Sequence, residues 1–202
     1  EAGHLTYIRT DSARLSQEAV EAAQSWIRET WGNQQLGTVN SRESGHGVQD
    51  AHEAIRPTDL RIETLDSVEP DAQQLYRLVR ATTLASLMIA SVRVALSLKG
   101  TCEGHSLSLE SSIGWYSELG WRRAFEVIDP MDESDTTPVQ VDIGTDCELT
   151  PGNAEHPNPA LREDKTKPPA RYRAHSIVKT MKETGIGRPS TYATTVERLQ
   201  ER

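Results

Sequence analysis

The hydrophobic period of this chain changes near residues 90 to 92, which indicates a boundary between a helical and a strand-forming part. Before it, apolar residues recur at the three-and-four spacing of helices. After it, Val92, Val94, Leu96 and Leu98 alternate with polar or small residues, as in a half-buried strand. We therefore expect a multi-domain α and β chain, with a helical domain over residues 1–91 and a β-rich domain over residues 92–168.

Two helices are expected in the first domain. Ser16 suits the N-cap of the first helix and Gly32 its end, while Pro70 suits the first position of the second helix. The apolar stripes expected to face the core are Val20, Ala23, Ile27 and Trp31 in the first helix, and Leu75, Leu78, Val79, Thr82 and Ile89 in the second.

The β-rich domain is expected to contain further strands at Phe125–Ile128 and Val139–Ile143, separated by acidic turns. Residues 149–169 are rich in proline and charge, which indicates a connector. A third domain then begins over residues 169–202. It should contain a short basic helix over 174–183, followed by a helix capped by Ser190 or Thr191.

Tyr7 and Arg9 lie two residues apart in the segment Leu5–Ser12. Thr6, Ile8 and Thr10 favour a strand, in which Tyr7 and Arg9 would share a face. A phenol, with an ordinary pKa of about 10, is a poor nucleophile unless its surroundings stabilise the phenolate. A guanidinium can do this and also matches the oxygens of a phosphate. Taken alone, the pattern favours a plainer interpretation: an interfacial tyrosine beside a solvated arginine.

His52 and Arg56 form a second candidate group. Pro57 disfavours helical dihedrals for Arg56, so the two side chains are not expected on one helix. A histidine can donate to a phosphate or move a proton near neutral pH. A surface or capping histidine explains the residue equally well.

Residues 185–193, between the two expected C-terminal helices, form a third candidate site. The free N–H groups at the start of the following helix suit a phosphate, and Arg188 adds positive charge. A tight joint between two helices is the alternative, but the basic composition on both sides favours a nucleic-acid contact.

The net charge of -8 argues at first against nucleic acid, but the charges are unevenly distributed. Residues 1–150 carry 12 Lys and Arg against 24 Asp and Glu, while residues 151–202 carry 10 against 6. Residues 125–150 alone hold eight acids and no Lys or Arg, so this segment accounts for the acidic excess.

Cys102 and Cys147 lack the spacing of a metal site, which favours a reducing cytosol. The most apolar run, residues 84–92, is too short to cross a membrane. The chain starts without Met and stops inside an expected helix, so we expect a piece of a longer protein.

Four blocks, in the same order, resemble the motifs of type IA DNA topoisomerases: Leu5–Ser12, Asp50–Thr58, Lys167–Tyr172 and Gly185–Ala193. The proline pair before Ala170 is most similar to the bacterial topoisomerase I branch. The resemblance implies a helical winged-helix or catabolite-activator-like catalytic domain. Part of a β-rich arch, which serves as the hinge of the gate, and the start of a helical single-strand DNA-binding domain would follow.

The resemblance also implies roles for individual residues. Tyr7 would attack a DNA phosphodiester and become joined to the 5′ phosphate of a transient single-strand break, while Arg9 would help to place that phosphate. The DNA-binding residues implied are His52, Arg56, Arg188, Ser190 and Thr191. Strand passage through the break would relax negatively supercoiled DNA without ATP.

The family's Mg²⁺ ions are held by an acidic toprim domain that precedes these blocks. Asp132 to Asp135 do not match that domain's context, so no metal ligand is expected in this chain. The implied partners are single-stranded or underwound DNA and the toprim domain of the same full-length chain. The implied state is a monomer at the bacterial nucleoid in the cytoplasm. Without the toprim domain the polypeptide is expected to be inactive, and a non-catalytic single-stranded-DNA-binding or gate module is the alternative.

Overall fold

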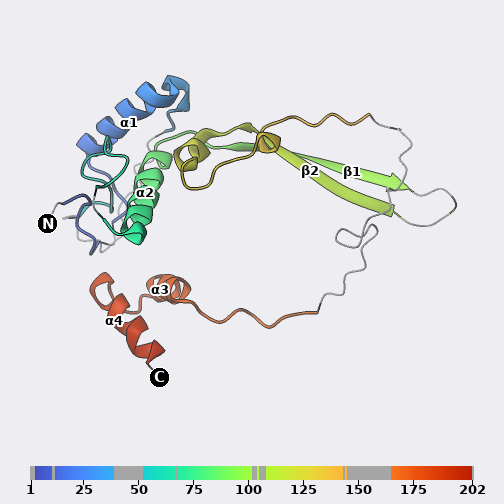
Figure 1. Ribbon diagram of the computed structural model, residues 1–202. Coiled ribbons are helices and arrows are strands. Elements are labelled where there is room, and N and C mark those ends of the chain that lie inside the picture. The colour runs from blue at the N-terminus through green and yellow to red at the C-terminus, as the bar shows by residue number, and fades with distance from the viewer. Residues whose placement is uncertain are drawn as a thin grey trace. The chain divides into compact units, whose positions relative to one another are not determined.

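The computed structural model describes residues 3–10, 12–38, 52–66, 68–101, 104, 108–142, 144 and 165–201. The chain divides into two compact units, Glu1–Val139 and Gln140–Arg202. Helices and one two-stranded sheet give a mixed α and β fold, as expected (Figure 1). Within these residue ranges, none of the helices has both the length and the apolarity needed to span a bilayer.

The first unit contains α1 (Gln17–Trp31), η1 (Asn33–Gln35), α2 (Pro70–Ala85), β1 (Val92–Thr101), β2 (Ser108–Glu118), η2 (Gly120–Phe125) and η3 (Glu133–Asp135). The second contains α3 (Ala174–Glu183) and α4 (Pro189–Gln200). The change from helix to strand falls between α2 and β1, where the hydrophobic period changes. The three domain boundaries expected from the sequence remain a prediction.

Helix α1 begins and ends where the sequence predicts. The Ser16 hydroxyl accepts a hydrogen bond from the Ala19 N–H at 3.3 Å, and Gly32 ends the helix with a positive φ of 91°. Val20 and Ile27 are buried, so the predicted stripe of α1 faces the core.

Helix α2 begins at Pro70 as predicted, but the predicted apolar stripe is wrong. Leu75 and Leu78 are 55% and 46% exposed, and the buried face instead carries Tyr76 and Leu84. Tyr76 can be buried because its hydroxyl donates to the Ile62 carbonyl oxygen at 2.8 Å. The polar tip of Tyr76 is therefore satisfied by a backbone carbonyl.

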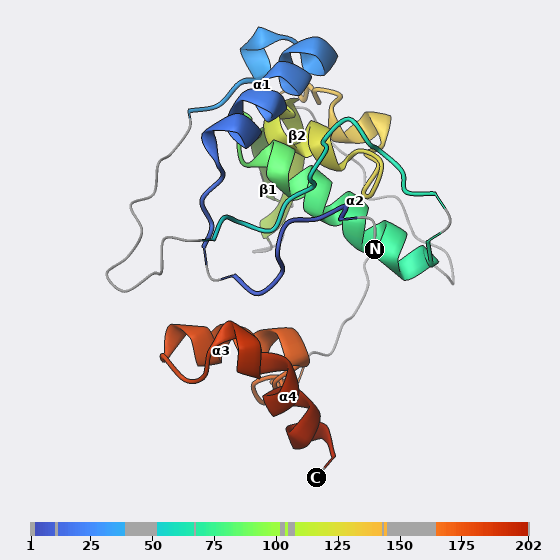
Figure 2. The ribbon, with the colours of Figure 1, turned by 90° about the vertical axis from the view of Figure 1, so that its left-hand side faces the viewer.

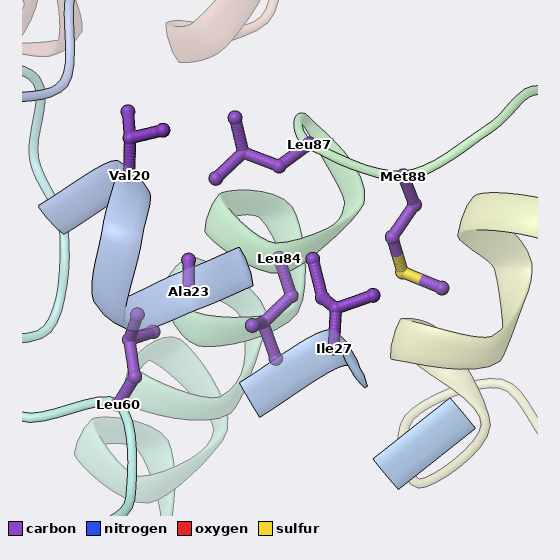
Figure 3. Packing of buried hydrophobic residues seen from close by; sticks show 7 residues of the cluster. All are labelled: Val20, Ala23, Ile27, Leu60, Leu84, Leu87 and Met88. Carbon is purple, nitrogen blue, oxygen red and sulfur yellow. The ribbon is translucent and has the colours of Figure 1, made fainter. Parts of the chain in front are cut away.

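The core of the first unit lies between α1 and α2 (Figure 3). Its buried side chains are Val20, Ala23, Ile27, Leu60, Leu84, Leu87 and Met88. Leu60 comes from the segment between the two helices, so this segment is anchored in the core as well. His52 and Arg56, the second candidate group, precede Leu60 in this segment.

Strands β1 and β2 pair antiparallel, with Val94 opposite Trp115 and Leu96 opposite Ile113. The predicted alternation in β1 is confirmed, since Val94, Leu96 and Leu98 are its less exposed positions. The two strands predicted beyond β2 are wrong over the described residues. Phe125 ends η2 and residues 126–128 form a turn, while residues 139–142 have no regular structure and Ile143 lies outside the described residues.

A compact polar junction joins the hairpin to the helical part of the first unit. The Ile89 N–H donates to the Gln35 carbonyl oxygen at 3.0 Å, and the Trp121 N–H donates to the Ile89 carbonyl oxygen at 2.9 Å. The Glu118 carboxylate accepts from the Gly120 N–H at 3.0 Å and from the Gln35 amide at 3.3 Å. The hydrogen bond from the Gly120 N–H is the main cause that lowers the pKa of Glu118 below its ordinary value.

In the second unit, α3 covers the predicted residues and Gly185 follows it with a φ of 72°. The predicted cap of α4 is wrong, because the helix begins at Pro189 and Arg188 is its N-cap. Pro189 suits that first position because its missing N–H has no helical partner there. Ser190 and Thr191 therefore lie in the first turn rather than before it.

Candidate active site

The segment that carries Tyr7 lies beside residues 52–58, as Figure 2 shows for the blue and teal segments. Leu5 and Pro57 form an isolated antiparallel bridge. The Thr6 N–H donates to the Arg56 carbonyl oxygen at 2.9 Å, and the Thr58 N–H donates to the His4 carbonyl oxygen at 3.0 Å. Residues 50 to 54 positions apart in the sequence are therefore brought together in one candidate site.

The prediction of a strand through Thr10 is wrong, because the chain bends at Ile8 and Arg9. The next bond of a ladder would run from the Arg56 N–H to the Thr6 carbonyl oxygen, but that N–H donates to the Thr6 hydroxyl at 3.0 Å. Arg9 is exposed on this bend and does not have the extended geometry that would align it with Tyr7.

Thr6 makes side-chain hydrogen bonds that sequence reasoning missed. Its hydroxyl donates to the Ala54 carbonyl oxygen at 2.8 Å and accepts from the Arg56 N–H at 3.0 Å. A hydroxyl in place of a backbone partner lets one residue bind two points on the opposite segment. The sequence indicated Thr6 only as a strand-forming residue, although its place beside Tyr7 in a motif was a usable signal.

Tyr7 and His52, predicted separately, lie in contact. Their rings stack with centroids 5.4 Å apart and an interplanar angle of 28°. Tyr7 is 57% exposed, so a phosphate in solution can reach the phenol. An exposed phenol beside an imidazole is an arrangement suited to general acid–base chemistry.

Arg56 is turned inward rather than toward solvent. Its guanidinium donates to both carboxylate oxygens of Glu53 at 2.9 Å and to the Pro57 carbonyl oxygen at 2.9 Å, and its side chain is 14% exposed. The prediction that Arg56 does not sit on a helix with His52 is confirmed. The guanidinium uses three of its five N–H donors within the protein.

Glu53 also connects this segment to α1, since its carboxylate accepts from the Ser16 N–H at 3.3 Å. Partial burial acts to raise the pKa of Glu53, but the hydrogen bonds from Arg56 and Ser16 together outweigh burial and hold the pKa below its ordinary value. The carboxylate is therefore charged at neutral pH.

The candidate residues of the second unit meet at the start of α4. The Thr191 hydroxyl accepts from the Arg188 N–H at 3.0 Å, and Arg188, Ser190 and Thr191 are all exposed. Gly187 precedes them with a φ of 78°, and a Cβ there would lie 3.2 Å from the Met181 side chain. Glycine thus allows the turn to pack closely on α3.

Within the described ranges, no three His, Cys, Asp or Glu side chains gather as a metal site would require. The acids of η3, Glu133 and Asp135, are no exception: the Asp135 carboxylate accepts from the Asp132 N–H at 3.1 Å, closing a local turn. The residues that the structure describes therefore do not fit the Mg²⁺ site that the resemblance assigns to a toprim domain.

The comparisons with known proteins agree on one class. A family model described as DNA topoisomerase matches residues 1–202. The DNA topoisomerase 1 of Salmonella typhimurium is 37% identical over 207 residues, which cover 100% of this chain and 22% of that protein. The DNA topoisomerase 1 of Mycobacterium tuberculosis is 32% identical over 222 residues and is covered to 23%.

The solved structure of full-length topoisomerase I from Thermotoga maritima superposes with a TM-score of 0.69 at 30% identity, over 96% of this chain and 30% of that one. The fold and the family match together define a DNA topoisomerase. The chain belongs to the bacterial type IA topoisomerases and spans about a fifth of the length of the DNA topoisomerase 1 relatives it matches.

Proposed function

We propose that this chain supplies the DNA-cleaving tyrosine of a type IA topoisomerase. The observation that carries the proposal is the exposed Tyr7 stacked on His52, on two segments that the core and Thr6 hold together. Membership of the family supports DNA as the substrate.

In the proposed reaction, the Tyr7 oxygen attacks a phosphodiester of one DNA strand. The phenol gives up its proton to solvent or to the adjacent His52 ring as a bond forms between its oxygen and phosphorus. The bond from phosphorus to the 3′ oxygen breaks, and the 3′ oxygen takes up a proton. The 5′ phosphate is then joined to Tyr7. Attack by the 3′ hydroxyl reverses these steps, so the phosphotyrosine bond conserves the energy of the linkage and resealing needs no ATP.

His52 is proposed to contact the strand and to exchange a proton near the reacting phosphate; the stacking of its ring on Tyr7 supports this role. Arg9, on the exposed bend two residues after Tyr7, is the cation proposed to meet the phosphate oxygens. Exposed side chains reorient easily, so DNA can draw Arg9 toward the phosphate on binding.

The second unit is proposed to hold the single strand. Arg188 supplies charge at the exposed start of α4, and the hydroxyls of Ser190 and Thr191 lie beside it in the first turn. Mg²⁺ would be supplied by a toprim domain outside this chain and would stabilise the charge on the reacting phosphate. Cleavage is therefore proposed to need that domain, with the complete protein working as a monomer at the nucleoid.

For the architecture, we infer that the helical part of the first unit is the catalytic, winged-helix-like domain and that the β1–β2 hairpin belongs to the arch. The abrupt passage from α2 to the hairpin supports this division. A non-catalytic single-stranded-DNA-binding module is the second candidate, favoured by the basic composition of residues 151–202.

The test is Tyr7→Phe in the full-length protein, assayed with a labelled single-stranded oligonucleotide. Denaturing gels should detect a covalent adduct with the wild type and none with the variant, because the phenylalanine ring has no oxygen to attack. The Kd for the oligonucleotide should change by less than about twofold, since one exposed hydroxyl adds little to binding. An adduct formed by the Phe variant would end the proposal.

A further inference from the structure

Glu53 makes contacts that the proposed chemistry does not use. Its two carboxylate oxygens take the Nε and Nη2 groups of Arg56, both at 2.9 Å, in a bidentate pair. One of the oxygens also accepts the Ser16 N–H at 3.3 Å. A single side chain thus joins the segment that carries His52 to the N-cap of α1.

The Arg56 guanidinium makes its contacts within the protein, to Glu53 and to its own segment. Its third N–H group donates to the Pro57 carbonyl oxygen. The next residue, Thr58, donates its backbone N–H to the His4 carbonyl oxygen. With the side chain 14% exposed, the guanidinium stabilises the shape of its own segment. Removing either charge would leave the other partly buried without an opposite charge beside it.

The two ends of the Tyr7 segment are therefore fixed relative to His52. At one end Thr6 is bound to the carbonyl of Ala54 and the N–H of Arg56. At the other end, the Ala54 N–H donates to the Arg14 carbonyl oxygen at 2.8 Å. Arg14 lies two residues before Ser16, whose N–H donates to the Glu53 carboxylate. Tyr7 follows Thr6 directly and His52 precedes Glu53 directly, so the two stacked rings are each one residue from these contacts.

We propose that Glu53 is a positioning residue: by holding Arg56 and the start of α1, it keeps the His52 ring in register with the Tyr7 ring. Its action is indirect, through His52, and it touches neither DNA nor the reacting atoms. The catalytic part of this inference rests on the proposed function, whereas the geometry of Glu53 does not depend on it.

The test uses the full-length protein and single-turnover adduct formation at a saturating concentration of a single-stranded oligonucleotide. Glu53→Gln removes the charge but keeps the shape of the side chain. We expect the rate to fall about 10- to 100-fold, as for a small misplacement of a catalytic group, with the Kd for the oligonucleotide changed less than about twofold. Glu29→Gln, which breaks the exposed Glu29–Arg61 pair on α1, should leave both quantities unchanged.

A double-mutant cycle separates positioning from a general loss of structure. If Glu53 acts through His52, then Glu53→Gln should slow the reaction by less than about twofold in the His52→Gln background. An equal loss in both backgrounds would overturn the inference, because it would mean that Glu53 affects the site by another route.

Arg56→Lys keeps the positive charge but loses the planar fork, so it should reproduce the rate loss of Glu53→Gln without weakening DNA binding. If thermal unfolding shows that Glu53→Gln does not fold, Arg56→Lys and its double-mutant cycle with His52→Gln provide the test. A weakened Kd with an unchanged saturated rate would instead make Arg56 a DNA contact and refute the inference. If the wild type forms an adduct and the Glu53→Gln rate is normal, the proposed function stands and this inference falls; if the wild type forms none, both fall.

Discussion

Gly120 is a single residue on which the junction between the helical part and the hairpin depends. Its φ of 48° lies in the left-handed region, and a Cβ built there would lie 2.4 Å from the Ala90 carbonyl oxygen. The same residue donates its N–H to Glu118. The chain can turn from β2 into η2 here because residue 120 has no side chain.

At this scale we predict that Gly120→Ala destabilises the protein by about 2–4 kcal/mol, because backbone strain and a clash with backbone atoms add. Gly104→Ala is the matched control: its φ of 80° imposes strain, but no atom lies within 4 Å of the added Cβ, so about 1 kcal/mol is expected. Urea unfolding of both variants measures the difference. Equal losses would show that the contact with Ala90 relaxes at no cost.

Individual candidate residues could be predicted from their chemical type and motif, but their contacts with distant parts of the chain could not. Tyr7 and His52 were selected from the sequence because each lies in a block that resembles a family motif, since neither residue taken alone favours a functional interpretation. Their contact could not be predicted, since it depends on the hydroxyl of Thr6 binding two points on a segment 48 and 50 residues away. The predicted DNA-binding role of Arg56 stays a prediction, and the structure adds a contact that the sequence did not indicate, the pair of its guanidinium with Glu53.

Helix α2 illustrates how an element can be predicted in position but not in orientation. Pro70 marks its start, yet the face that it buries is chosen by partners elsewhere in the chain. Arg80 packs its guanidinium 4.9 Å from the centre of the Trp26 ring and donates to the Leu60 carbonyl oxygen at 2.9 Å. Since these partners lie on α1 and on the connecting segment, hydrophobic periodicity within α2 could not reveal them.

The orientation of α2 gives a prediction for its leucines. Leu84→Ala should destabilise the protein by about 2.5–4 kcal/mol because Leu84 is 0% exposed in the core cluster. Leu78→Ala, on the same helix, removes the same atoms from a half-exposed site and should cost less than about 1 kcal/mol. Thermal and urea unfolding compare the two, and a larger loss for Leu78→Ala would contradict the observed orientation of the helix.

Across the whole molecule, charge is separated along the chain rather than mixed. The acidic excess lies in residues 125–150, whereas residues 151–202 have a net charge of +4, from 10 Lys and Arg against 6 Asp and Glu. A chain with a net charge of -8 can therefore still present a basic surface to DNA. The change of hydrophobic period gave the division into helical and strand-forming parts, but the strands predicted beyond β2 failed because short apolar runs form turns as easily as strands.

At this scale we predict that Arg188→Ala weakens single-stranded DNA binding in a salt-dependent way. Loss of one phosphate contact should reduce the slope of log Kd against log salt concentration by about 0.7. Arg198→Ala provides the control, because Arg198 is also exposed on α4 but lies about 15 Å further along the helix axis. Fluorescence anisotropy with an oligonucleotide at several salt concentrations measures both, and equal slopes for Arg188→Ala and wild type would contradict a phosphate contact at the start of α4.

The hydrogen bonds of Thr6 also have a consequence for the order of folding. They join residues 48 and 50 positions apart, so they form only after the intervening chain has closed into a loop. Helix α1 lies within that loop and can form earlier from local contacts. During folding, Tyr7 and His52 should therefore be solvent-separated until the segment through Thr58 has docked, and the stack of the two rings forms in one of the last steps.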